Sequence, residues 1–167
     1  RAPEPPGLAY WNGQGYTAPQ VYAFSTCNEP VTEFGGFANA TTVVSKAYQT
    51  AFGRNGDGAG IAWWAGQFTN DTYALNSDKR GQFFVDFLAA AVGDDVTALD
   101  KRTEVAQYWV QQLVDHRCPW DEFGKTVMQG VNYQSNVAQV KASIDARISQ
   151  MEAMALTGAY PGPSACN

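Results

Sequence analysis

From Asn39 onward, apolar residues recur every three or four positions, and this repeat constrains the fold more than any other feature of the sequence. An α-helix turns once every 3.6 residues, so this spacing gathers apolar side chains on one helix face, whereas a β-strand requires alternation. Helix-capping residues and glycines divide the repeat into segments at about 39–52, 57–68, 77–92, 94–115, 119–129 and 135–157. The sequence therefore predicts an all-α fold, a bundle of about six helices.

The segment that precedes this repeat has a different composition. Residues 1–38 hold five of the eight prolines, interleaved with glycines and aromatic residues, and they show no helical period. Residues 21–26 could form one short strand, because Val, Tyr, Phe and Thr are typical of strands. We therefore expect an irregular N-terminal arm at 1–38, a helical domain at 39–157 and a C-terminal coil tail at 158–167.

The aromatic side chains of the arm indicate that it lies against a protein surface, because a disordered tail is usually polar. Prolines restrict the arm before it docks, so less conformational entropy is lost on binding. We expect the arm to dock on a neighbouring subunit; the alternative is an arm that folds back on its own helices. The candidate assembly contacts are Tyr10, Trp11, Tyr16, Tyr22 and Phe24.

Charge and histidine content disfavour several classes of function. The chain carries 16 acidic and 11 basic residues, a net charge of −5, which argues against nucleic acid and anionic membranes as partners. No apolar stretch approaches the roughly 18 residues of a membrane span. His116 is the single histidine, so we expect no enzyme activity, metal site or cofactor. Paired acids at 94–95 and 121–122 stand at expected helix starts and are interpreted as caps.

The three cysteines, Cys27, Cys118 and Cys166, lie far apart and form no C-x-x-C pair, so no zinc or redox motif is indicated. Three cysteines allow one internal disulfide in any of three pairings. We expect a disulfide that ties Cys27 or Cys166 to the helical core or to the other end of the chain. The sequence begins at Arg1 with a Pro-rich stretch, which resembles a mature protein after removal of a signal peptide. We therefore expect an extracellular or cell-surface location.

The densest motif lies in residues 48–64 and predicts two helices joined by a tight glycine turn. Asp57 can cap the second helix, Arg54 can brace the Asp57 carboxylate, and Gly60 allows the helices to approach closely. A calcium loop is the alternative, but the bidentate Glu required at position 12 of such a loop would fall at Gly66. We interpret the motif as a structural turn. Its residues are Tyr48, Gly53, Arg54, Asp57, Gly60 and Trp64.

This motif resembles the signature of a bacterial helical domain of unknown function found in secreted RTX-type adhesins and S-layer-like surface proteins. The signature is L-Y-x-x-x-L-G-R-x-x-D-x-x-G-L-x-Y-W-x-x-x-L. The residues that match this signature, in order, are Tyr48, Phe52, Gly53, Arg54, Asp57, Gly60, Ile61, Trp63, Trp64 and Phe68. Segments at 84–88, 96–108 and 136–145 are similar to later helices of the family, so the resemblance covers about residues 40–150. The chain lacks the family's calcium-binding G-G-x-G-x-D repeats, and the resemblance implies a helical surface-protein module with little chemistry.

Composition indicates how such a chain works. Charged residues make up 16% of it, against about 25% in an average soluble domain, and nine Phe, eight Tyr and five Trp are present. One explanation is a large aromatic core; the other is a surface buried against other copies, because interfaces lose Lys and Glu and gain aromatic residues. We expect a secreted bacterial surface structural protein that self-assembles with other copies into a filament, sheath or layer. The alternative is an adhesin-type binding module that recognises a glycan or another surface ligand through exposed aromatics such as Trp11, Trp63 and Trp120.

Overall fold

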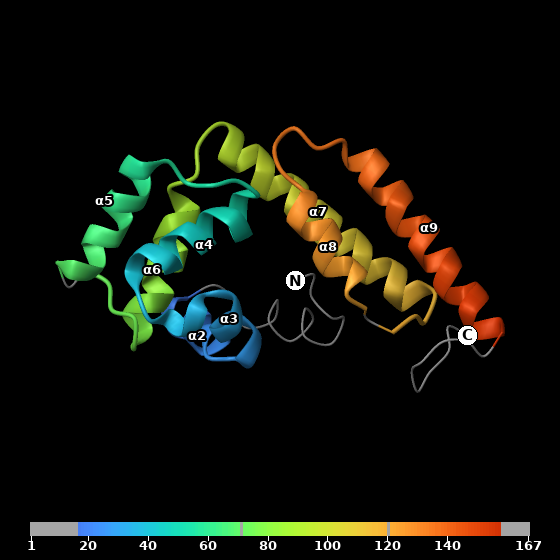
Figure 1. Ribbon diagram of the computed structural model, residues 1–167, viewed down its shortest axis with the longest axis horizontal. Coiled ribbons are helices and arrows are strands. Elements are labelled where there is room, and N and C mark those ends of the chain that lie inside the picture. The colour runs from blue at the N-terminus through green and yellow to red at the C-terminus, as the bar shows by residue number, and fades with distance from the viewer. Residues whose placement is uncertain (1–16, 71, 120, 158–167) are drawn as a thin grey trace. The chain divides into compact units, whose positions relative to one another are not determined.

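The computed structural model describes residues 17–70, 72–119 and 121–157, and this part of the chain is helical with no strand (Figure 1). The all-α prediction is confirmed. In chain order the elements are α2 (Ala18–Ser25), α3 (Asn28–Glu33), the short 3-10 helix η1 (Gly35–Phe37), α4 (Ala40–Phe52), α5 (Gly58–Thr69), α6 (Asp78–Ala89), α7 (Asp94–Asp115), α8 (Phe123–Gly130) and α9 (Val137–Leu156).

The described chain forms two compact units, which divide near the start of α7. The N-terminal unit comprises residues 17–96 and contains α2 to α6 with the first residues of α7. The C-terminal unit comprises residues 97–157 and contains the rest of α7 with α8 and α9. The sequence predicts one domain at 39–157 behind a separate arm, whereas the structure groups residues 17–38 with α4, α5 and α6.

Local capping residues begin and end the helices near the predicted positions. Asn39 caps α4, where its Oδ1 accepts the N–H of Thr42 at 2.9 Å. Gly53 ends α4 in the left-handed region, with φ 65°. Asp57 and Ser77 similarly cap α5 and α6 through their side chains. These caps depend on a few neighbouring residues, which is why the sequence predicts them well.

Two helix boundaries differ from those predicted. α6 ends at Ala89 instead of reaching residue 92, because the N–H of Ala91 bonds the carbonyl of Leu88 at 3.2 Å and tightens the last turn. α8 begins at Phe123 instead of residue 119. Asp121 Oδ1 accepts the N–H of Phe123 at 3.0 Å, so an acid just before the helix satisfies its first amide.

Residues 17–38 are helical, so the irregular arm is wrong for this part of the chain, and so is the strand expected at 21–26. Thr17 precedes α2 and donates through both its N–H and its hydroxyl to Gln20 Oε1. Pro19 lies in the first turn, where the missing N–H of proline costs no hydrogen bond. α2 shows no apolar period because the groups that stabilise it lie on α6, far along the chain.

The tightest packing in the N-terminal unit is between α2 and α6. A Cβ atom placed on Gly81 would overlap the carbonyl oxygen of Ala18. Glycine at this position therefore lets the two backbones touch. Tyr22 fastens the next turn of α2, because its hydroxyl donates to the carbonyl of Asn76 at 3.2 Å.

An aromatic cluster fills the space between α4, α5 and α6. The buried Trp64 ring meets Phe83 and Phe87 edge-on, with ring centroids 5.8 and 5.4 Å apart. Tyr48 also meets Phe87 edge-on, at 4.9 Å. Such edge-on pairs stabilise a core beyond the apolar area that they bury. Other rings of the cluster belong to Phe52, Phe68 and Tyr73.

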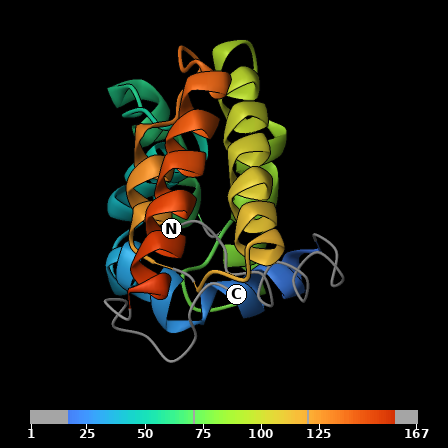
Figure 2. The ribbon, with the colours of Figure 1, turned by 90° about the vertical axis from the view of Figure 1, so that its right-hand side faces the viewer.

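The C-terminal unit has a largely aliphatic core, around which α7, α8 and α9 lie side by side (Figure 2). The buried Trp109 ring packs 5.8 Å from the ring of Phe123 at the start of α8. Arg147 of α9 donates from Nε to Asp121 Oδ2 at 2.8 Å, which fastens α9 to the start of α8. The buried core residues are Val105, Trp109, Val110, Leu113, Cys118, Met128, Val131, Ile144, Ile148 and Met151.

We predict that Gly81→Ala destabilises the N-terminal unit, because the added methyl group would displace the Ala18 carbonyl and move α2 away from α6. Overpacking costs about 1–3 kcal/mol, and overlap with backbone places the expected loss in free energy of unfolding at the upper end of that range. Chemical denaturation followed by circular dichroism measures this loss.

Gly66→Ala is the matched control, since Gly66 lies within α5 and nothing lies within 4 Å of a Cβ placed there. Alanine in an open helical position should raise the free energy of unfolding by about 0.4–1 kcal/mol. If both substitutions change stability in the same direction and by the same amount, Gly81 is not at a close backbone contact.

Candidate functional site

The turn between α4 and α5 contains the motif that the sequence singles out, and its residues form a packed corner. Asp57 Oδ1 accepts the N–H of Gly60 at 2.7 Å, and this bond lowers the pKa of the Asp57 carboxyl. A Cβ atom on Gly60 would lie 2.7 Å from the Tyr48 hydroxyl, and one on Gly56 would overlap the Tyr48 ring. Tyr48 therefore fills the turn, and glycine at positions 56 and 60 leaves room for its side chain.

Arg54 braces a different carboxylate from the one expected. Instead of Asp57, it binds Asp95 in a bidentate pair, with Nε to Oδ1 and Nη2 to Oδ2 both at 2.6 Å. Its Nη1 donates to the Asn55 carbonyl at 2.9 Å, and its guanidinium lies 4.8 Å from the Tyr48 ring centroid. The hydrogen bonds to Asp95 raise the pKa of Arg54. The pair ties the end of α4 to the first turn of α7, where the helix dipole also favours a carboxylate.

Tyr73 connects the aromatic cluster to a charged group on α6. Its ring packs 5.6 Å from Phe83, and its hydroxyl donates to Asp86 Oδ2 at 2.9 Å. Burial and the neighbouring carboxylate raise the pKa of Tyr73 to about 12. Tyr73 is therefore a hydrogen-bond donor that stays protonated, not an acid or base for chemistry at neutral pH.

A buried arginine fastens α2 to α6. Arg80 is 6% exposed, and its guanidinium lies 3.8 Å from the Phe37 ring centroid and 4.8 Å from that of Tyr22. Its Nε donates to Ser25 Oγ at 2.9 Å, and its Nη1 donates to the Leu75 carbonyl at 2.6 Å. Burial lowers the pKa of Arg80. Rings and neutral oxygens, and not a described carboxylate, surround this cation.

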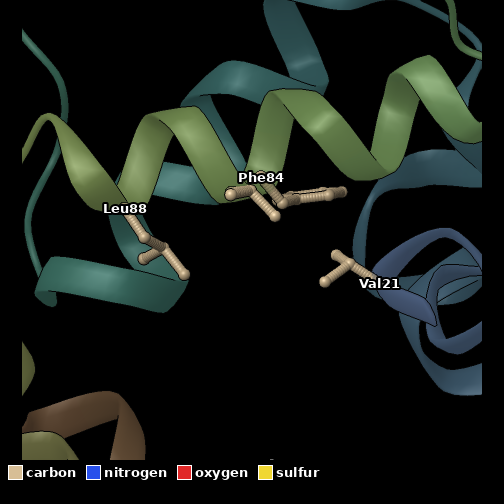
Figure 3. A pocket seen from close by; sticks show the side chains of 4 residues that line it. Val21, Phe84 and Leu88 are labelled. Carbon is tan, nitrogen blue, oxygen red and sulfur yellow. The ribbon is translucent and has the colours of Figure 1, made fainter. Parts of the chain in front are cut away.

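α2 and α6 also form the walls of an apolar groove on the N-terminal unit (Figure 3). Its volume is about 200 Å³, and Leu88 is 40% exposed at its rim, so the groove opens to solvent. The four described side chains that line it are all hydrocarbon, so they can bind an apolar group but cannot orient a polar substrate or move a proton. The lining residues are Val21, Phe84, Val85 and Leu88.

Two neighbouring phenylalanines of α6 could have revealed this groove in the sequence. Successive residues of a helix point about 100° apart, so Phe83 and Phe84 have different surroundings although their ring centroids are 5.0 Å apart. Phe83 is buried in the aromatic cluster, whereas Phe84 lines the groove. The apolar repeat of residues 77–92 predicts one inward face and does not set Phe84 apart, and no local pattern marks Arg80 as buried.

The candidate assembly contacts lie mostly outside the described residues. Tyr10, Trp11 and Tyr16 precede residue 17, and the side chain of Phe24 is also outside the described part. Tyr22 is half-buried on α2 and packs over a cation of its own chain. The structure therefore gives an intramolecular role to Tyr22, and the roles of the others stay predictions.

The cysteines occupy different environments. Cys27 is an exposed free thiol just before α3, whereas Cys118 is buried in the core of the C-terminal unit. A Cys27–Cys118 disulfide is therefore not formed. Cys166 lies outside the described residues, so a disulfide that includes it stays a prediction.

Within the described ranges, no three His, Cys, Asp or Glu side chains form a group that could hold a metal ion. His116 Nδ1 lies instead 2.8 Å from Glu152 Oε1. Among the helices of the described residues, none is both long enough and apolar enough to cross a membrane.

We predict a coupling energy of about 1–2 kcal/mol between Arg54 and Asp95, because the pair is bidentate and partly shielded from water. A double-mutant cycle with Arg54→Ala and Asp95→Ala, read by denaturant unfolding, measures it. The control is the pair of Lys141 and Glu104, joined by one contact of 2.7 Å and more exposed. That pair should couple by about 0.5 kcal/mol, and equal couplings would contradict the clamp.

We also predict that stability falls in alkali as Tyr73 ionises. Its pKa of about 12 in the folded protein lies above the ordinary value of about 10, so its stabilisation is complete below pH 10 and disappears as the pH rises toward 12. Two pKa units correspond to about 2–3 kcal/mol. Unfolding measured across this window should show a shallower pH dependence for Tyr73→Phe than for the wild type, and identical slopes would refute this coupling.

The chain was compared with known protein families, curated proteins and solved structures. None of the three comparisons finds a match.

Proposed function

We propose that this protein is a bacterial surface structural protein that self-assembles outside the cell into a filament, sheath or layer. The observation that carries the proposal is the open apolar groove between α2 and α6. A chain that works as a soluble monomer gains nothing from leaving such a groove in water, whereas a subunit can bury it against another copy.

Exposed apolar side chains extend beyond the groove on the same unit. Val92, just after α6, is 75% exposed, and Leu88 and Val96 are exposed four residues to either side of it. Single exposed apolar residues are normal on any protein. Together with the groove, which Leu88 itself lines, these side chains leave more apolar surface of this unit in water than a single exposed residue would.

Residues 1–16 supply a suitable binding element for this surface. The segment contains three aromatic residues but only two charged ones, Arg1 and Glu4, so docking would desolvate few ions. It leads directly into α2, which forms one wall of the groove. The resemblance of residues 48–64 to a domain of secreted surface proteins supports the same location and role.

A second candidate function rests on Trp63. Its indole is 59% exposed on α5, next to the buried Trp64, and an exposed indole can stack on a sugar ring. This observation favours an adhesin-type module that binds a glycan. A monomeric protein that binds glycans, and that loses this binding in Trp63→Ala, would favour the adhesin over the polymer.

Deleting residues 1–16 should abolish assembly without unfolding the protein. The deletion stops at residue 16 because α2 packs against α6 and is part of the N-terminal unit. We expect polymers of the full chain in negative-stain images and size-exclusion chromatography. The shortened chain should be a monomer with an unchanged helical circular dichroism spectrum.

A matched variant replaces Arg1 and Glu4 with serine and keeps every aromatic residue of the segment. It should assemble like the full chain, because the aromatic anchors and not the charges are proposed to bind. The proposal fails if native full-length protein is monomeric, or if the shortened chain still polymerises.

A further inference from the structure

The groove between α2 and α6 has the size of one large side chain. Its volume is about 200 Å³, and a buried cavity of about 150 Å³ can hold benzene. Pockets for drug-sized ligands and cofactors are larger, about 300–1,000 Å³. The volume therefore fits one aromatic anchor that belongs to a longer chain.

The groove also selects for an apolar anchor. In Figure 3, Phe84 and Leu88 project from α6 toward the same opening as Val21 of α2. All of these side chains are hydrocarbon, so a charged or strongly polar group would lose its hydration there without compensation. An indole or phenyl ring loses little and buries its apolar faces.

We propose that this groove binds the N-terminal segment of a second copy of the chain, with Trp11 as the anchor. This inference rests on the proposed self-assembly and identifies where the segment docks. Trp11 has the largest side chain in residues 1–16, and it precedes Thr17 by six residues, so an extended chain places it at most about 20–22 Å from residue 17. That reach is enough to enter the groove of a subunit in direct contact with the N-terminal unit.

The contact would be directional. The donor contributes its first residues, and the acceptor contributes the α2–α6 groove of the N-terminal unit, so the two sides of the contact differ. A contact between unlike surfaces builds a ring if its rotation closes and an open filament if it does not. An open chain of subunits has a free groove at one end and a free segment at the other. It could therefore grow at both ends.

Site-directed disulfide formation between two different chains tests the proposal. Both chains carry Cys27→Ser, which removes the exposed free thiol. One chain then carries Asn12→Cys, which keeps the Trp11 anchor, and the other carries Val85→Cys, and the two are mixed under mild oxidation. We expect a covalent dimer that contains one copy of each, identified by mass spectrometry.

The control replaces the second partner with Thr69→Cys, an exposed position at the end of α5. Its dimer should stay at the background level seen without Asn12→Cys. Equal dimer yields with Val85→Cys and Thr69→Cys would overturn the proposal, because they would report random collision.

A doubly substituted chain, Asn12→Cys with Val85→Cys, distinguishes the two possible sources of the segment. A disulfide confined within single chains would show that the arm occupies its own groove and would overturn the proposal. Disulfide-linked ladders would support it. Neither result depends on a destabilising substitution in the core.

Val85→Asp provides an independent readout, with Thr69→Asp as its control of equal charge. We expect Val85→Asp to lose polymers while it keeps the helical circular dichroism spectrum, and Thr69→Asp to assemble normally. If Val85→Asp assembles normally, the groove is not the docking site although self-assembly stands. If wild-type protein never assembles, the proposed function itself fails.

Discussion

The contact between Gly81 and the Ala18 carbonyl is the constraint on which the N-terminal unit depends. Because residue 81 has no side chain, α2 lies directly on α6. Arg80, the preceding residue, can then reach Ser25 and pass its guanidinium beneath Tyr22. The same approach sets the width of the groove between the two helices. One absent methyl group therefore positions both a buried cation and an exposed apolar surface.

Among the described residues, each unit contains one buried arginine whose hydrogen bonds go to neutral oxygens. Arg80 binds a hydroxyl and a carbonyl in the N-terminal unit, and Arg102 donates to the Val131 carbonyl in the C-terminal unit. Burial lowers the pKa of both, yet an arginine stays charged because its ordinary pKa lies far above neutral pH. Removing such a side chain would leave buried carbonyls without a donor. These arginines therefore hold loops and helix ends in place by hydrogen bonds, with no carboxylate partner in the described part of the chain.

The sequence predicts those features that depend on neighbouring residues. The caps at Asn39 and Asp57 act over three positions, so α4 and α5 begin where expected. Local patterns do not predict α2, because the residues that stabilise it, above all Gly81, lie more than fifty positions away. For the same reason Arg54 was assigned to nearby Asp57, whereas folding brings Asp95 to it. The groove was missed because helix periodicity shows which positions are apolar, and not whether a second helix will cover them.

The hydrocarbon lining of the groove has a consequence for temperature. Burial of apolar surface near room temperature is driven mainly by the entropy of water, and this driving force weakens on cooling. It is also little affected by the ionic screening that weakens contacts between charges. An assembly joined through Val21, Phe84, Val85 and Leu88 would therefore loosen in the cold and tolerate salt, the opposite of one held by ion pairs.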